Sequence, residues 1–418
     1  MYKNKKLLMT TLMSSALVLA ACGNGEDQSG NGEGVSGDTV TLELFSNKSE
    51  SVDTYNRLIE QFEAEHDNIT IELEAPPEAE TVLRTRLTRD DLPDILSIGG
   101  NATYGELGRE GVFYDFSDSE LLGDIQPAYL DMLGALVGSD DEGDYGVPYA
   151  TNANGVIYNQ TLFDELGMEI PETWDDFLGL LEQAQTEGVT PILFTFQDAW
   201  TTLPAWNGLG GVLVEDNFAE MKTEGEASFV EDYPEVTEKY LELLEYGEGD
   251  IFGVGYEQGN ASFANGEALF YIQGNWAIPE ITTNNEDIEL GFFALPASDN
   301  AEENDLVSGV DVLLTVSEST DYPEEALTFI EFMLEQEVAS QYIEEQAAFS
   351  AVEGVLQEDP VFEDIQQYFE NGNLTSFPDH YYPAGLGAEN LVQQYLIDQN
   401  TESFLQTMDS EWDANVSR

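Results

Sequence analysis

Several polar and aromatic side chains directly follow predicted strands, at positions from which they can contact a ligand. In one such stretch Gly266 ends a helix, residues 268–272 form a short apolar strand, and Gly274-Asn275 turns the chain, with Asn275 able to cap a new helix. Trp276 then lies where a strand's carboxyl end meets a helix's amino end, the edge at which open α/β sheets bind ligands. A lone tryptophan could instead fill the core, but similar junctions elsewhere in the chain favour a ligand role.

Catalytic chemistry is poorly supported by the sequence. It contains no Gly-x-Ser-x-Gly elbow, no His-Glu-x-x-His and no phosphate-binding Gly-Lys-Ser/Thr loop. Carboxylate pairs that resemble a glycosidase arise by chance among 84 Asp and Glu residues. His66 and His380 are separated by most of the chain, and residues 139–144 lack EF-hand spacing, so a solvated loop is preferred there over a Ca²⁺ site. We therefore expect no enzyme activity, no cofactor and no metal.

The composition indicates a large globular protein with an unusual charge. The 418 residues are 42% hydrophobic and 11% aromatic, which is consistent with two or three folded domains. Only 12 Lys and Arg residues oppose the 84 acids, giving a formal net charge of −72. Such a surface repels nucleic acid and anionic lipid headgroups. An anionic ligand would need clusters of Arg or Lys, which are nearly absent. The acids are spread along the chain, which is typical of a solvated, halophile-type surface that salt stabilises.

The amino terminus reads as a targeting segment. Residues 1–21 combine lysines with an apolar region too short for a confident membrane span, and predict a signal peptide. The run Leu19-Ala20-Ala21-Cys22-Gly23 resembles a bacterial lipobox, which implies cleavage before Cys22 and a diacylglycerol anchor on its sulfur. Residues 22–37 are Gly-rich and acidic, as in a flexible tether. We expect a lipid-anchored protein on the extracellular face, or in the periplasm of a two-membrane bacterium.

Alternating elements in the first part of the body indicate a parallel α/β lobe. Their ranges are strand 39–45, helix 52–66, strand 69–73, helix 81–88 and strand 94–98. Ser46-Asn47 and Gly100-Asn101 follow the first and third strands, so their side chains lie at carboxyl ends.

A second series repeats this pattern farther along the chain. Residues 154–159 and 190–194 are predicted strands, and a helix opens in residues 171–177 with Thr173 as its cap. Asp198 and Trp200 come just past the second of these strands. Two α/β series thus end their strands in polar or aromatic side chains.

Short motifs in a characteristic order now identify a resemblance that covers nearly the whole chain. The chain resembles extracellular solute-binding proteins of ABC importers, in the carbohydrate group that includes the maltose-binding protein. The pieces that carry it, besides the lipobox and the first strand and helix, are Leu92-Pro93-Asp94-Ile95, Tyr145-Gly146-Val147-Pro148-Tyr149, Tyr158-Asn159, Pro171-Glu172-Thr173-Trp174, Phe263-Ala264-Asn265-Gly266-Glu267-Ala268, Gly274-Asn275-Trp276, Phe349-Ser350-Ala351-Val352 and Phe377-Pro378-Asp379-His380-Tyr381-Tyr382-Pro383.

The resemblance implies an α/β, two-lobed periplasmic-binding-protein fold of the class II type, with a ligand cleft between lobes joined by three crossings. Carried onto this sequence, the crossings lie near residues 150–153, 292–295 and 349–351. Lobe 1 would then comprise residues 38–150 plus 295–348, and lobe 2 residues 151–294 plus 349–418.

The resemblance also assigns a sugar site, because pyranose C–H faces stack on aromatic rings and hydroxyls bind carboxylates, amides or guanidinium groups. The implied stacking residues are Trp276, Trp200 and Tyr382, with Tyr149 and Tyr381 as further candidates. The implied hydrogen-bonding residues are Asp198, Asn101, Asn47, Ser46, Asn275 and Asp311. Arg84 could donate to a hydroxyl or form a surface ion pair, and Asp311 could instead cap a helix.

The function implied is that of a monomeric cell-surface lipoprotein that captures a sugar or oligosaccharide by lobe closure and delivers it to an ABC permease. Ile98 and Ala102 stand where the maltose-binding protein has a Trp and an Arg, so the identity of the sugar does not transfer. Alternatives are a binding protein for a polyamine, whose amines could pair with Asp198 and Asp311, or for a peptide. A secreted glycoside-active enzyme is the third alternative.

Overall fold

The computed structural model describes residues 39–76, 79–89, 91–138, 143–247, 249–383 and 385–416. The predicted signal peptide, the tether and most of the acidic loop 139–144 lie outside these residues. Among the helices that are described, none combines the length and apolar character needed to span a bilayer.

Lobe 1 is built on three parallel strands. These strands are β1 (Val40–Ser46), β2 (Ile69–Glu74) and β3 (Ile95–Ile98), and β1 pairs in parallel with both of the others. The predicted strand–helix–strand series is therefore confirmed. In the helix α1 (Val52–Glu65) the buried side chains recur at helical spacing, as the sequence predicted.

The described strands form one sheet of ten, in the order β2-β1-β3-β8-β4-β6-β5, with β7 and β9 paired with β4 and β10 paired with β8. The two longest strands are β4 (Val147–Asn159) and β8 (Leu306–Val316), which run antiparallel to each other. The short strand β9 (Phe349–Ser350) pairs with the same part of β4 at Ala150 and Thr151. Three distant segments of the chain are thus held side by side at one place.

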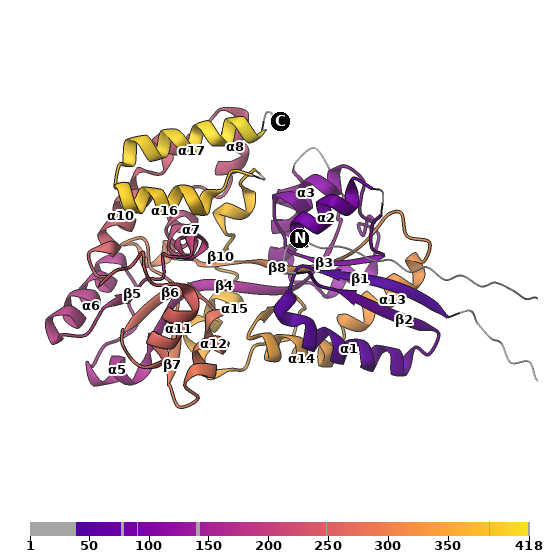
Figure 1. Cartoon of the computed structure of the whole chain (residues 1–418), viewed down its shortest axis with the longest axis horizontal. Coiled ribbons are helices and arrows are strands. Elements are labelled where there is room, and N and C mark those ends of the chain that lie inside the picture. Colours follow the sequence, from indigo (N-terminus) through magenta and orange to yellow (C-terminus); the bar gives the residue numbers. More distant parts are fainter. Residues whose placement is uncertain are drawn as a thin grey trace, which may run out of the picture. The chain divides into compact units, whose positions relative to one another are not determined.

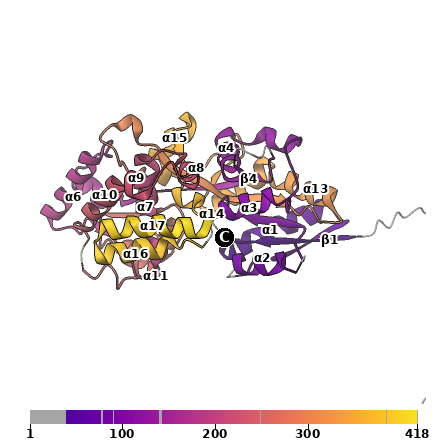
Figure 2. The same cartoon turned by 90° about the horizontal axis from the view of Figure 1, so that it is seen from above.

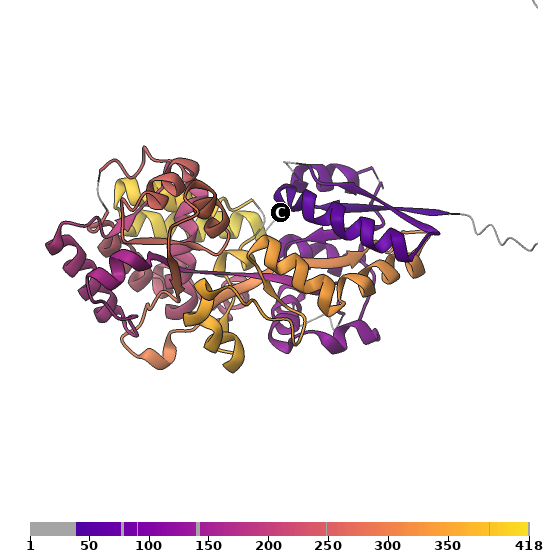
Figure 3. The ribbon, with the colours of Figure 1, turned by 90° about the horizontal axis from the view of Figure 1, so that it is seen from below.

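Helices cover both faces of this sheet. In lobe 1, Figure 1 shows α2 and α3 on one face of the strands and α1 and α14 on the other. The view from below brings the indigo α1 and the orange helices to the front (Figure 3). In lobe 2 the yellow α16 and α17 lie over α7 on one face, as the view from above shows (Figure 2). The remaining elements of lobe 1 are η1 (Ser49–Ser51), α2 (Ala79–Leu87), α3 (Ala102–Arg109), η2 (Glu120–Asp124), α4 (Pro127–Val137), α13 (Pro323–Met333) and α14 (Gln336–Gln346).

Among the described residues, lobe 2 contains more and generally shorter elements than lobe 1. In the element labels, η denotes a 3₁₀ helix. The lobe 2 elements are α5 (Gln160–Glu165), α6 (Trp174–Glu187), β5 (Ile192–Leu193), η3 (Ala199–Thr202), α7 (Leu203–Leu213), α8 (Phe218–Glu224), α9 (Phe229–Asp232), α10 (Pro234–Leu244), α11 (Tyr256–Ala264), β6 (Phe270–Gly274), α12 (Ala277–Asn284), β7 (Leu290–Phe293), η4 (Ala301–Glu303), η5 (Pro360–Ile365), α15 (Gln366–Asn371), β10 (Leu374–Thr375), η6 (Pro378–Tyr381), α16 (Ala388–Asp398) and α17 (Thr401–Val416).

Local predictions for this lobe are largely confirmed. Thr173 caps α6, because its hydroxyl accepts a hydrogen bond from the Asp176 N–H. Gly266 has the positive φ of 75° expected after the end of α11. The strand predicted at residues 268–272 lies two residues later, as β6.

Three apolar cores divide the described residues. Core 1 joins β1, β2 and β3 to the later helices α13 and α14. Cores 2 and 3 lie on the lobe 2 strands, with Val156 in core 2 and Ile157 in core 3. Successive residues of β4 face opposite sides of the sheet, which separates these two cores.

Core membership suggests lobe limits that differ in part from the expected ones. Leu295 packs in core 2 and Leu306 in core 3, while Val310 packs in core 1. We propose that the second crossing lies within β8, between Leu306 and Val310, rather than near residues 292–295. Ala351 packs in core 1 although it was expected in lobe 2.

Candidate functional site

The tip of β1 carries a cation that sequence reasoning did not select. Ser46 is buried, and its hydroxyl accepts a hydrogen bond from the Lys48 N–H at 3.1 Å. The Lys48 ammonium lies 2.6 Å from the Asp311 Oδ1 on β8, and the Asn152 side chain of β4 donates to the same oxygen at 3.0 Å. Asp311 lies within a strand and caps no helix, so that alternative is excluded. Its carboxylate instead connects the middle of β8 to the middle of β4 and to the residue two positions beyond the end of β1.

The two asparagines predicted on this side also have partners inside the lobe. With its amide oriented to satisfy both neighbours, Asn47 donates to the Ser97 carbonyl at 3.2 Å and accepts from the Gly99 N–H at 3.3 Å. Asn101 caps α3, and its Oδ1 accepts from the N–H groups of Thr103 and Tyr104. These amides hold the carboxyl ends of β1 and β3 in place.

Arg84 comes from the last turn of α2. Its guanidinium donates to the Thr103 hydroxyl at 3.1 Å, and the side chain lines a pocket together with Asn101. The structure thus brings Arg84 and Asn101 together on lobe 1, and the ligand role of Arg84 stays a prediction.

On lobe 2, Trp276 lies directly before α12 and is half-buried against core 3. Its indole N–H donates to the Gln273 Oε1 at 3.3 Å. Asn275 does not make the helix cap predicted for it. Its Oδ1 accepts from the Ala153 N–H at 2.8 Å, and its amide donates to the Ala347 carbonyl at 2.7 Å. Because both groups are used and the residue is buried, a ligand role for Asn275 is not supported.

Asp198 and Trp200 lie at the entry to η3 and share one neighbour. The Asp198 Oδ2 accepts from the Tyr256 N–H at 2.8 Å, at the start of α11. The Trp200 side chain is 39% exposed, and its ring contacts the Tyr256 ring with 4.8 Å between centroids. Tyr256, which sequence reasoning missed, therefore holds both predicted residues.

The predicted tyrosines are largely structural. Tyr149 is 1% exposed and packs edge-on against Tyr342 in core 1, so it presents no face to a ligand. Tyr382 is buried in core 2, and its hydroxyl accepts from the Trp206 indole at 3.0 Å. Its predicted stacking role is not supported, since Phe229 and the other neighbouring rings enclose it. Tyr381 is half-buried and lines a pocket.

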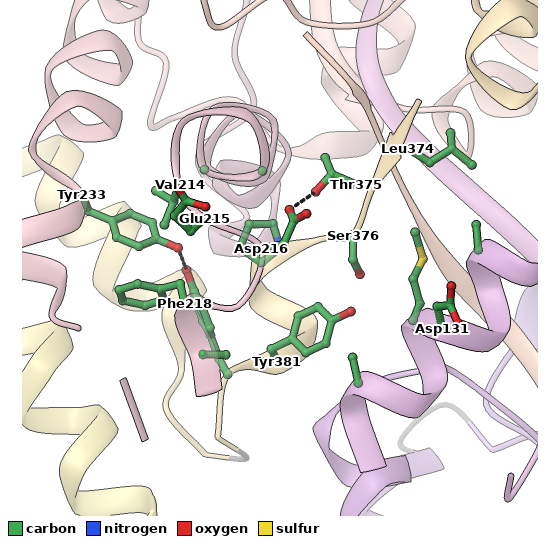
Figure 4. A pocket seen from close by; sticks show the side chains of 18 residues that line it. Asp131, Val214, Glu215, Asp216, Phe218, Tyr233, Leu374, Thr375, Ser376 and Tyr381 are labelled. Atoms are coloured by element: carbon green, nitrogen blue, oxygen red, sulfur yellow. Dashed lines mark hydrogen bonds between the residues drawn. The ribbon is translucent and has the colours of Figure 1, made fainter. Parts of the chain in front are cut away.

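Two pockets have walls from both lobes. The Arg84 pocket, of about 250 Å³, places Arg84 and Asn101 together with Asp379, His380 and the edge of Tyr382. The second, the Tyr381 pocket, measures about 380 Å³. Figure 4 shows Asp131 of α4 on one side of it and Tyr381 on the other.

The charged groups that line the Tyr381 pocket are Asp131, Glu215 and Asp216, all exposed. Asp216 also accepts a hydrogen bond from the Thr375 hydroxyl at 3.1 Å (Figure 4). Exposed carboxylates are common over the whole surface of this acidic protein. The three carboxylates of this pocket therefore do not indicate a particular ligand.

Burial dominates the electrostatics of the Arg84 pocket. It lowers the pKa of His380, an effect that Lys48 reinforces and that Asp379 and Asp311 oppose. Burial also raises the pKa of Asp379, which His380 and the amide of Asn207 partly offset. The His380 ring stacks on Phe377 and lies against Gly309 of β8.

Sequence reasoning therefore missed Lys48, Gln273, Tyr256 and His380 as parts of this region. Lys48 had a usable signal, because it directly follows the selected Ser46-Asn47 on a chain with few cations. His380 lay inside the aromatic segment but was weighed only as a metal ligand. No group of three or more His, Cys, Asp or Glu side chains suited to a metal occurs among the described residues.

Comparison with known proteins agrees with this geometry. The model of the family described as bacterial extracellular solute-binding protein matches residues 47–340. The multiple sugar-binding protein of Streptococcus mutans is 28% identical over 366 residues, which cover 85% of this chain and 84% of that protein. The melibiose/raffinose/stachyose-binding protein MelE of Bacillus subtilis is 23% identical over 400 residues, which cover 88% of this chain and 86% of MelE.

Solved structures give the same result. The apo form of RafE from Streptococcus pneumoniae superposes with a TM-score of 0.79 at 25% identity, covering 91% of this chain and 99% of RafE. RafE in complex with raffinose gives a TM-score of 0.75 at 26% identity, and the match covers 90% of this chain and 100% of RafE. The two-lobed fold and the family match over most of the chain lead to one conclusion: the chain belongs to the bacterial extracellular solute-binding protein family.

Proposed function

We propose that this chain is the substrate-binding subunit of an ABC importer and captures a sugar or oligosaccharide between its lobes. The observation that carries the proposal is that both lobes present aromatic or cationic side chains past their strand ends, although the linings of the Arg84 and Tyr381 pockets include neither tryptophan. Lobe 2 supplies the indoles of Trp276 and Trp200 beside Asp198, while lobe 1 supplies Arg84 and Lys48. Names of the relatives support the ligand class, since one is a multiple sugar-binding protein and RafE was solved with raffinose.

The chemistry of a neutral sugar fits these groups. An indole face removes the apolar C–H face of a pyranose from water, and charged groups make strong hydrogen bonds to hydroxyls. Neither interaction needs a net charge on the ligand, so the acidic surface does not oppose binding. The aromatic groups and the lobe 1 cations belong to different lobes, so a ligand that contacts both stabilises the closed state.

Ligand capture without turnover is part of the proposal. The relatives named above are binding proteins, and the carboxylates near the site are engaged in hydrogen bonds to Tyr256 and Asn152. A chromogenic glycoside that the purified protein hydrolyses, with loss of hydrolysis in Asp198→Asn, would contradict it.

A thermal-shift screen at molar salt tests the ligand class. A ligand that binds only the folded protein raises the melting temperature, by about 2.7 kcal/mol of added stability at a hundredfold excess over Kd. We expect raffinose, stachyose or another saccharide to raise it and spermidine to have no effect. A response to spermidine alone would instead favour a polyamine-binding protein.

We further propose that Cys22 carries a lipid anchor and that the mature, monomeric protein delivers its ligand to a membrane permease. Both Cys22 and its lipobox lie outside the described residues, so sequence alone supports the anchor. Cys22→Ala should release the protein from washed membranes or block its processing. Unchanged membrane retention of this variant would argue against lipidation at Cys22.

A further inference from the structure

The indole of Trp276 is in close contact with the backbone of its own loop. A Cβ atom placed on Gly274 would lie 2.0 to 2.3 Å from three carbons of the six-membered ring. The ring therefore lies directly on the Gly274 backbone, where any larger residue would displace it. Residue 274 is fixed in β6 by pairing with Asn154 of β4, so this support belongs to the sheet.

Gln273, the preceding residue, contacts the same indole at its edge. It is fully buried in β6, opposite Gly155 of β4. Its Oε1 accepts the hydrogen bond from the Trp276 indole N–H at 3.3 Å. Its Nε2 is buried and makes no hydrogen bond to a described residue.

A buried amide with one unsatisfied end is unfavourable for folding. The hydrogen bond from the indole to Oε1 therefore gives this side chain a defined task, beside a weaker interaction with the Tyr271 hydroxyl. The terminal torsion of tryptophan has broad, roughly two-fold minima, so packing on Gly274 leaves more than one orientation of the ring. The hydrogen bond to Gln273 selects one of them.

We propose that Gln273 is a positioning residue, which with Gly274 fixes the orientation of the Trp276 indole before a ligand arrives. Its effect on sugar binding rests on the proposed function, whereas its effect on the indole does not. An indole that is already ordered loses less conformational freedom on binding. We expect a three- to tenfold gain in affinity from this preorganisation, on the order of the freedom of one side chain.

The first test needs no ligand. The difference in near-UV circular dichroism between wild type and Trp276→Phe isolates the contribution of this indole among five tryptophans. In a Gln273→Met background, which keeps the volume and removes the acceptor, that difference should shrink by at least half. In a Gln273→Glu background, which keeps an acceptor, it should persist. An unchanged difference spectrum in Gln273→Met would overturn the proposal.

The second test is a double-mutant cycle on raffinose affinity, which is measured by calorimetry. Gln273→Met should weaken binding three- to tenfold in the wild-type background and have no further effect in Trp276→Phe, which lacks the indole N–H. Equal losses in both backgrounds would show that Gln273 acts through general packing, which contradicts the proposal. If raffinose does not bind the wild type, the proposed ligand fails while the spectra still decide the role of Gln273.

Two further variants control for destabilisation. Asn260→Leu removes another fully buried amide, which donates to Glu280 at 2.9 Å, and should leave the Trp276 spectrum unchanged. The methyl group added in Gly274→Ala would displace the Trp276 indole from the residue 274 backbone, while the Gln273 side chain is unchanged. This substitution should alter the spectrum and lower raffinose affinity at least threefold even if Gln273→Met does not fold, and a wild-type result for Gly274→Ala would overturn the proposal.

Discussion

The two lobes use their predicted site residues in different ways. On lobe 1, Ser46, Asn47, Asn101 and Asp311 each hydrogen-bond to neighbouring elements of the chain. On lobe 2, the Trp200 side chain is 39% exposed, and Trp276 is only half-buried. These lobe 1 groups connect elements of the chain to one another. On lobe 2, Asn275 and Tyr382 likewise have internal partners, but the two tryptophans keep aromatic surface accessible.

This difference separates stability from affinity. Groups with internal partners cost stability when they are removed, because the remaining partner loses its hydrogen bond. A partly exposed ring costs little stability and offers its apolar area to a ligand. We therefore expect substitution of the two lobe 2 tryptophans to weaken binding, and substitution of the internally bonded lobe 1 groups to weaken the fold.

The largest effect is expected for Trp276→Ala. Loss of the indole should remove an apolar contact of about 1.4–2.7 kcal/mol, which is roughly a ten- to hundredfold loss of affinity for the sugar, with raffinose as the probe. Calorimetry of the Trp276→Ala variant measures the loss of affinity, and a thermal melt of the same variant measures its stability. A stability loss of about 3–5 kcal/mol would mean that the ring is core, and the lobe comparison would fail.

The matching substitution on lobe 1 is Asp311→Asn. It removes the charge that contacts Lys48, in a pair whose side chains are 20% and 27% exposed. We expect a stability loss of about 1–2 kcal/mol, between the values for buried and surface pairs. Denaturant unfolding measures it, and Asp321→Asn on the same lobe is the surface control. A large loss of affinity at unchanged stability would place Asp311 with the ligand groups.

Trp200→Ala should have a smaller effect than Trp276→Ala. The ring contacts Tyr256 and the residue is 39% exposed, so we expect a three- to tenfold loss of affinity with little change in melting temperature. Titration with raffinose checks the first part, and unaltered affinity would exclude Trp200 from the residues that contact the sugar.

A pH effect should come from His380, in the Arg84 pocket. Burial lowers its pKa in the folded state, so the unfolded chain binds a proton first as the pH falls from neutral through about 6.5. Stability should therefore fall between pH 7.5 and pH 6, and His380→Gln should reduce that fall. Urea midpoints at the two pH values measure it; an equal fall in the variant would exclude His380 as the cause.

The smallest effect on binding is expected from salt. The net charge of −72 repels itself, so the denaturation midpoint should rise from dilute buffer to molar salt. Stacking on indoles is not screened, so raffinose affinity should change less than twofold over the same range. A flat or falling midpoint would mean that the acidic surface is no salt adaptation.

The sequence predicted what depends on local spacing. Alternating apolar residues located β1, β2 and β3, and their order predicted the parallel pairing. Trp276 and Trp200 were correctly placed beyond strand ends, because that position depends only on the neighbouring residues. The resemblance added the two-lobed arrangement.

Local sequence patterns could not predict contacts between residues that are distant along the chain. Asn275 bonds to Ala347, and Tyr149 packs on Tyr342, across separations that no local pattern reports. An asparagine or tyrosine after a strand has the same sequence signature whether its side chain meets a ligand or another part of the protein. That ambiguity explains why the sequence did not show the internal partners of Asn275 and Tyr149, and the ligand role of the tryptophans stays a prediction.

The central strand β4 has a consequence for how the chain acquires its structure. Residues 147–159 pair with partners in β6, β7, β8 and β9, the last of which ends at Ser350. Closing such long loops slows folding, because chain entropy is lost before distant pairs form. A chain that is synthesised from its amino end thus lacks the partners for β4 until most of it has emerged from the ribosome. Neither lobe can complete its sheet as an independent fragment, and truncations before Ser350 should expose unpaired strand edges that aggregate.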